Sequence, residues 1–146
     1  MNKSSEYEIF RSIKGASPQS SVPLFQENVS AGFPSPAENY IENSLDLNDL
    51  MIKHPASTFF VRVQGDSMNG AGISTGDILV VDKALEASSG RIIVAIINGE
   101  FTVKRLMINA KGVFLEPANP KYRSLVISEE MDFQVWGVVT YVIHKT

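Results

Sequence analysis

From residue 57 onward the chain is a succession of short β-branched and aromatic runs, each bounded by turn-forming residues. The seven runs are STFFVRV (57–63), DILVVD (77–82), GRIIVAII (90–97), EFTVKRLMI (100–108), GVFLEP (112–117), SLVIS (124–128) and FQVWGVVTYVI (133–143). Such residues favour strands, and Asn98-Gly99 between two runs is a strong signal for a two-residue hairpin. Successive strands without long helices between them predict a mainly β fold, with an antiparallel sheet wrapped into a small barrel or sandwich.

The first thirty or so residues have a different composition. KGASPQSSVP (14–23) is rich in Ser, Gly and Pro, which predicts an extended, mobile arm. The two prolines of AGFPSPAENY (31–40) favour extended backbone there as well. We therefore divide the chain into an amino-terminal arm, residues 1–31, and a β domain, residues 32–146.

A short helix is predicted within SLDLNDLMIKHP (44–55). Asp46 is a suitable amino-terminal cap, and Leu47, Leu50 and Met51 fall on one helical face before Pro55 ends the segment.

The overall composition limits the classes of function. A chain of 146 residues, 44% hydrophobic and 20% charged, is typical of one ordinary globular domain. Its net charge of −3 argues against a broad basic face for nucleic acid, so we expect no direct specific DNA binding. The absence of cysteine excludes disulfides, thiol nucleophiles and thiolate metal sites. No apolar run suits a signal peptide or membrane span, so we expect a cytoplasmic protein.

One serine lies on an unusually flexible corner. Ser67 stands in QGDSMNG (64–70), directly after a predicted strand. Gly, Asp, Ser and Asn are also ordinary turn residues, so this corner has a purely structural interpretation too. A nucleophilic Ser67 needs a base, because a free hydroxyl is scarcely ionised near neutrality. The two histidines, His54 and His144, are candidates by type, but nothing in their spacing brings either to Ser67.

Lysine is the other candidate base. In the run 100–108, strand alternation places Lys104 on one face with Thr102 and Leu106, and Arg105 on the opposite face. One of these two adjacent cations is therefore expected to be at least partly buried. Lys104 then either extends its charged end to solvent or becomes buried, in which case its pKa falls.

Other site chemistry has little support in the sequence. Two distant histidines and scattered acidic residues offer no metal-ligand spacing, and no phosphate-binding glycine motif occurs. We expect neither a metal nor a cofactor. The segment GDSMNGAGISTG (65–76) is interpreted as a loop that turns tightly twice, with Ser74 and Thr75 serving the turn.

Three blocks resemble one known family. GDSM (65–68), GISTGDILVVD (72–82) and GEFTVKRL (99–106) are similar, in order and spacing, to the self-cleaving serine–lysine proteins of the LexA and UmuD family. The resemblance implies that Ser67 is the nucleophile and Lys104 the general base. It also implies a scissile bond at Ala31-Gly32 in SAGFP, with backbone N–H groups of Ser67 and Asp66 holding the oxyanion.

Within this family the chain resembles the UmuD branch over roughly residues 22 to 144. That branch implies a small LexA/UmuD-like β domain, a homodimer, and removal of the arm after DNA damage. The activator would be RecA on single-stranded DNA, and the shortened product would join a UmuC-like subunit in the error-prone translesion DNA polymerase V. Cleavage within one chain or across a dimer is left open.

Three other interpretations compete with this one. They identify the chain as a non-catalytic dimeric binding module, as a fragment of a LexA-type repressor, or as a relative of membrane signal peptidases. The intact set of Ser67, Lys104 and Ala31-Gly32 argues against the first. The short, Ser/Pro-rich segment before Gly32 argues against a repressor, and the lack of an apolar anchor argues against a signal peptidase.

Overall fold

The computed structural model describes residues 8–11, 21–25, 31–32 and 41–146. These residues fall into two compact units. The larger lies within Met1–Ser12 and His54–Thr146, and the smaller within Ile13–Lys53.

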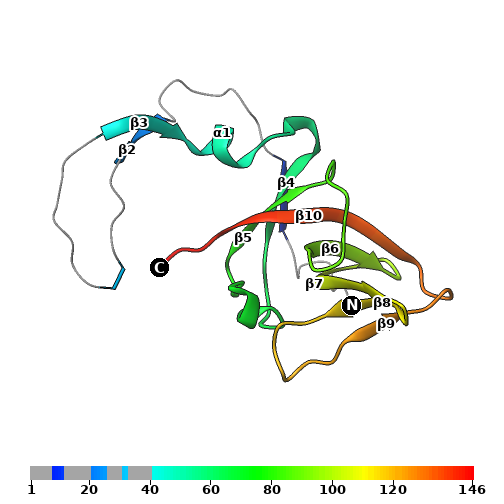
Figure 1. Ribbon diagram of the computed structural model, residues 1–146. Coiled ribbons are helices and arrows are strands. Elements are labelled where there is room, and N and C mark those ends of the chain that lie inside the picture. The colour runs from blue at the N-terminus through cyan, green and yellow to red at the C-terminus, as the bar shows by residue number, and fades with distance from the viewer. Residues whose placement is uncertain (1–7, 12–20, 26–30, 33–40) are drawn as a thin grey trace. The chain divides into compact units, whose positions relative to one another are not determined.

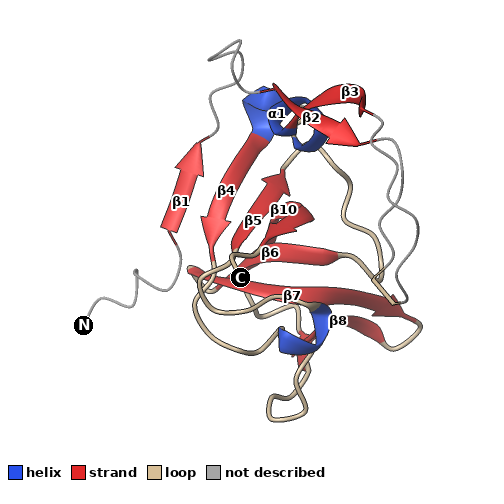
Figure 2. Cartoon of the chain, turned by 90° about the vertical axis from the view of Figure 1, so that its left-hand side faces the viewer, coloured by secondary structure: helices blue, strands red, loops and turns tan. Residues whose placement is uncertain are grey.

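The larger unit is built on one antiparallel sheet of eight strands in the order β1-β4-β5-β10-β6-β7-β8-β9 (Figure 1). Its strands are β1 (Glu8–Arg11), β4 (Thr58–Arg62), β5 (Ile78–Asp82), β6 (Ile92–Ile97), β7 (Glu100–Asn109), β8 (Gly112–Glu116), β9 (Leu125–Ile127) and β10 (Phe133–Ile143). Figure 2 shows that β6 and β7 cross the direction of β4 and β5, so the sheet coils strongly. The predicted mainly β, antiparallel fold is confirmed.

Strand β10 joins the two halves of this sheet. Its first half pairs with β6 and its second half with β5, and the register shifts once on each side. Gly137 lies at one of these shifts. A Cβ atom there would lie 2.5 Å from Cγ1 of Val81, a distance that no real side chain tolerates. Glycine therefore lets β10 pass close to β5.

Two apolar clusters form the core, and β6 contributes to both. The first consists of Val61, Val63, Met68, Ile73, Leu79, Val81, Val94 and Val103. The second consists of Ile93, Ala95, Leu106, Leu115 and Val138. Met68 and Ile73 belong to the loop after β4, and burying such side chains contributes about 1.5–3 kcal/mol each. The loop that carries Ser67 is thus anchored in the first cluster.

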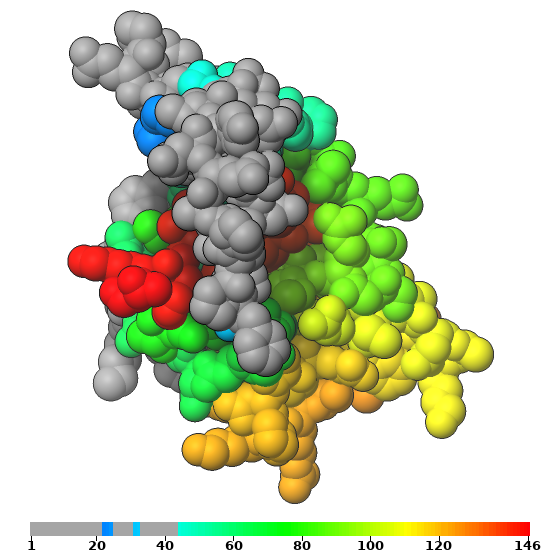
Figure 3. Space-filling view, turned by 60° about the vertical axis from the view of Figure 1, so that its left-hand side comes forward, coloured from blue at the N-terminus to red at the C-terminus, as the bar shows by residue number. Residues whose placement is uncertain are grey.

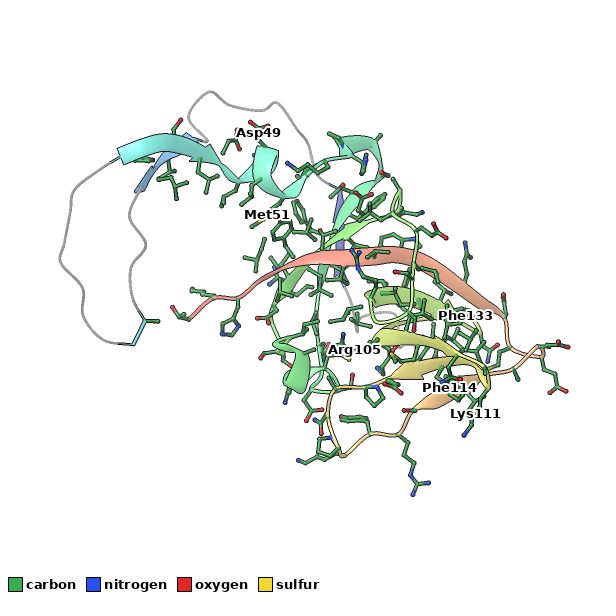
Figure 4. All side chains as sticks on the ribbon, viewed as in Figure 1. Asp49, Met51, Arg105, Lys111, Phe114 and Phe133 are labelled. Carbon is green, nitrogen blue, oxygen red and sulfur yellow. The ribbon has the colours of Figure 1, made fainter. Side chains whose placement is uncertain are left out.

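The smaller unit contains a strand pair and the short helix. Strands β2 (Ser21–Phe25) and β3 (Ile41–Asp46) pair in antiparallel fashion. Helix α1 (Leu47–Met51) follows directly and begins where the Asp46 carboxylate accepts from the Asn48 N–H at 2.9 Å. Figure 4 labels Asp49 and Met51 on this helix. The predicted cap is confirmed, although the helix is only five residues long.

All seven strands predicted from residue 57 onward are present, with ends displaced by no more than two residues. Asn98 and Gly99 have φ values of 48° and 83°, the positive values that a two-residue hairpin turn favours. Strands β1, β2 and β3 were not predicted. Part of the predicted arm and of AGFPSPAENY lies outside the described residues, so the division at residue 31 stays a prediction. Among the helices described, none has the length and hydrophobicity that a membrane crossing requires.

Candidate active site

Ser67 is held by a loop whose backbone is fixed at several points. The loop leaves β4, passes through the 3₁₀ turn η2 (Asn69–Ala71) and enters β5. Thr75 closes it, because its hydroxyl both accepts from the Gly65 N–H and donates to the Gly65 carbonyl, each at 2.9 Å. The Asp77 carboxylate accepts from the Ser74 N–H at 2.8 Å. The prediction that Ser74 and Thr75 serve this turn is confirmed.

Lys104 reaches this loop from β7. Its Nζ donates to Oγ of Ser67 at 3.0 Å, to Oγ1 of Thr102 at 2.9 Å and to the carbonyl of Val103 at 3.1 Å. Both Ser67 and Lys104 are partly buried. The sequence left open whether Lys104 extends to solvent or is buried, and the structure shows it partly buried with its amine beside the serine hydroxyl.

The adjacent cation has a different position, as strand alternation predicts. Arg105 follows Lys104 on β7 (Figure 4), and its guanidinium donates to the carbonyl of Gly90 at 2.8 Å. One cation of the pair thus contacts the candidate nucleophile, and the other ties β7 to the turn that precedes β6.

The two histidines bind carboxylates. Nδ1 of His54 lies 2.5 Å from Oδ2 of Asp82, and Nδ1 of His144 lies 2.6 Å from Oδ1 of Asp77. Both aspartate side chains are almost fully buried, at 7% and 2% exposure. These imidazoles satisfy buried acidic groups, whereas the side chain that contacts Ser67 is that of Lys104.

The segment after β8 also contacts the serine loop, which the sequence analysis did not foresee. The Asn119 side-chain amide donates to the carbonyl of Asp66 at 2.8 Å, and the Tyr122 hydroxyl donates to the Asp66 carboxylate. The Ala118 N–H donates to the carbonyl of Ser67 at 2.8 Å. Sequence offered only a weak signal for this contact, an Asn and a Tyr in a Pro-rich turn more than fifty positions from the serine.

Lys104 also lines a pocket of about 340 Å³. Its walls mix apolar side chains with one acidic and two basic groups. The residues that line the pocket are Ile97, Asn98, Glu100, Phe101, Thr102, Lys104, Leu115, Arg123 and Leu125. The pocket is large enough to receive side chains of an extended peptide segment.

The expected scissile residues, Ala31 and Gly32, belong to the smaller unit. Both lie in a bend and are exposed. Among the described residues, no three His, Asp or Glu side chains gather as metal ligands would. The described site is therefore a serine hydroxyl beside a lysine amine, a pair of groups suited to nucleophilic catalysis.

Comparison with protein families gives one match. A family described as Peptidase S24-like matches residues 23–140, which is most of the chain.

Individual relatives agree with this match. The chain is 52% identical over 128 residues to Protein SamA of Salmonella typhimurium, covering 88% of this chain and 89% of the relative. It is 49% identical over 126 residues to Protein ImpA of Escherichia coli, covering 85% and 84%. It is 43% identical over 135 residues to Protein MucA of Escherichia coli, covering 92% and 91%. These relatives are therefore similar to the chain through most of their lengths.

Proposed function

Because the chain belongs to the S24 peptidase-like family of self-cleaving serine peptidases, among the UmuD-like proteins of SOS mutagenesis, we propose that it cuts its own Ala31-Gly32 bond. Ser67 is the nucleophile and Lys104 the general base. The observation that carries this proposal is the 3.0 Å contact between Nζ of Lys104 and Oγ of Ser67.

The first half of the reaction separates the arm. Neutral Lys104 takes the hydroxyl proton of Ser67, and Oγ attacks the carbonyl carbon of Ala31. Backbone N–H groups of Ser67 and Asp66 receive the oxyanion that forms. The bond to the Gly32 nitrogen then breaks, Lys104 returns its proton to that nitrogen, and Ala31 remains as an ester on Ser67.

The second half restores the serine. Lys104, neutral again, takes a proton from water, and the hydroxide attacks the ester carbon. The ester bond breaks, Oγ of Ser67 recovers the proton from Lys104, and the new carboxylic acid of Ala31 loses its remaining proton to water, so the arm leaves as a carboxylate. Thr102 supports this cycle because its hydroxyl holds the lysine amine at 2.9 Å.

Regulation follows from the nature of the reaction. A self-peptidase without control would destroy its own precursor, so the cleavable arrangement must be a minor population at rest. We propose that RecA filaments on single-stranded DNA bind the cleavable form preferentially and thereby raise its population. In this proposal the protein is a cytoplasmic homodimer, and the shortened chain joins a UmuC-like subunit of DNA polymerase V.

The test is the mass of the purified protein after incubation with RecA and single-stranded DNA at neutral pH. We expect a product that begins Gly-Phe-Pro, and a much slower reaction without RecA. Ser67→Ala is the matched control and should stay intact. A product beginning elsewhere would overturn the site assignment. An intact chain under all conditions would favour the non-catalytic binding module instead.

A further inference from the structure

The segment between β8 and β9 forms hydrogen bonds with the peptide groups before and after Ser67. We propose that Asn119 and Tyr122 are positioning residues for self-cleavage, which orient the Ser67 N–H toward the oxyanion by holding Asp66. This inference rests on the proposed function, because it concerns how the same serine is prepared for attack.

The contacts form a short ladder between two segments. The Asn119 amide donates to the Asp66 carbonyl at 2.8 Å, and the Ala118 N–H donates to the Ser67 carbonyl at 2.8 Å. In the reverse direction, the Gly70 N–H donates to the Ala118 carbonyl at 2.6 Å. In Figure 3 the gold residues that follow β8 border the green residues of the serine loop. Both peptide groups of Ser67 are thus fixed from one side.

The geometry of the peptide bond turns this grip into an orientation. The Asp66 carbonyl and the Ser67 N–H belong to one planar peptide group, which is trans, so they point in opposite directions. When Asn119 holds the carbonyl on one side, the N–H is aimed to the other side. An oxyanion donor acts only if it is aimed before the reaction begins. The hydrogen bond to Asn119 therefore pre-sets the candidate donor.

Asn119 and Tyr122 are themselves held in place. Oδ1 of Asn119 accepts from the Lys121 N–H at 3.0 Å, and the Tyr122 N–H donates to the Asn119 carbonyl at 3.1 Å. This turn leaves the Asn119 amide nitrogen directed at Asp66. The Tyr122 hydroxyl fixes the same residue through its carboxylate. Asp66 is therefore anchored at its carbonyl and at its side chain.

The chain offers a matched control for Asn119. Oδ1 of Asn109 accepts from the Lys111 N–H at 2.8 Å, in the hairpin between β7 and β8. Asn109→Ala removes the same kind of turn bond as Asn119→Ala, but at a distance in the fold from Ser67. A difference between the two variants reports the contact with Asp66.

The experiment measures the first-order rate of self-cleavage against pH, without partners, for the full chain and both variants. We expect Asn119→Ala to lower the rate by about 10-fold to 100-fold, less than loss of a whole oxyanion donor. The fall should be the same at every pH, because the base is untouched. Asn109→Ala should cleave as the unaltered chain does. Tyr122→Phe should lower the rate by about 3-fold to 10-fold, since it loosens Asp66 without freeing its carbonyl.

Three outcomes would overturn the inference. The first is an Asn119→Ala rate equal to that of Asn109→Ala. The second is a displaced midpoint of the pH profile, which would mean that Asn119 acts through the lysine. The third is a rate loss explained by the unfolded fraction in a thermal melt. If Asn119→Ala does not fold, Tyr122→Phe decides, and an unchanged rate there rejects the proposal. If the unaltered chain is cleaved only with RecA on single-stranded DNA, the same comparison of variants is made with RecA present. Absence of cleavage in the unaltered chain under all conditions instead rejects the proposed function, and this inference with it.

Discussion

At the scale of single residues, the protonation state of Lys104 decides which partner donates in the hydrogen bond between Lys104 and Ser67. The amine and the hydroxyl lie 3.0 Å apart, and a protonated amine can only donate to the serine oxygen. General-base catalysis requires the opposite, a neutral amine that accepts the serine proton. The protonation state of Lys104 therefore separates a resting pair from a reacting pair with no change of position.

This direction predicts the pH dependence of cleavage. The fraction of neutral lysine grows as pH rises toward its pKa, which is ordinarily near 10.4, so spontaneous cleavage should accelerate under alkaline conditions. A histidine base would level off above roughly pH 7. Lys104→Ala should be inactive because it lacks the base. Lys104→Arg should be inactive as well, because a guanidinium keeps its proton throughout this range. Product formation followed from pH 6 to 10 is the measurement.

The controls for this prediction are the two histidine variants. His54→Ala and His144→Ala should retain the alkaline reaction, since both imidazoles bind carboxylates. A folded Lys104→Ala protein that still cleaves with an unchanged profile would contradict the serine–lysine mechanism.

At the scale of elements, β10 determines whether the sheet is continuous. It is the one strand that pairs with both β5 and β6 among the described residues, and Gly137 lets it approach β5. In the sheet order, β10 and β6 lie between β5, where the serine loop ends, and β7, which carries Lys104. The position of the amine relative to the serine thus depends on how this strand packs.

Gly137→Ala tests the close approach. The added methyl group meets Cγ1 of Val81 at 2.5 Å, and overpacking of this kind costs about 1–3 kcal/mol. Urea unfolding should show that loss. In a Val81→Ala background the same substitution should cost clearly less, because the clashing group is gone. Equal costs in the two backgrounds would mean that the strain lies elsewhere.

At the scale of the whole molecule, a histidine near the carboxyl terminus braces the serine loop. His144 follows β10 and contacts Asp77, whose other oxygen accepts from the Ser74 N–H. Asp77 is almost fully buried, at 2% side-chain exposure. The last strand and the turn that closes the loop are therefore joined through one buried carboxylate.

His144→Ala should remove one partner of that carboxylate and lower the free energy of unfolding by about 1–3 kcal/mol. Chemical denaturation measures this change, and alkaline cleavage by the folded fraction should persist. Unchanged stability would contradict the bracing role. A stable variant that no longer cleaves would make His144 part of the chemistry.

Local sequence determined the strands from β4 onward, the Asn98-Gly99 hairpin, the Asp46 cap and the face of β7 that carries Lys104. Each depends on residues only a few positions apart, where side-chain preference and alternation act directly. The central place of β10, the pairing of β1 with β4 and the two His–Asp pairs were decided by tertiary structure alone. The hydrogen bond from Asn119 to Asp66 was also decided by tertiary structure, because a turn has no local preference for a partner 53 positions away. Such contacts form only when the sheet order brings distant segments together, and hydrogen-bonding groups buried there must find partners.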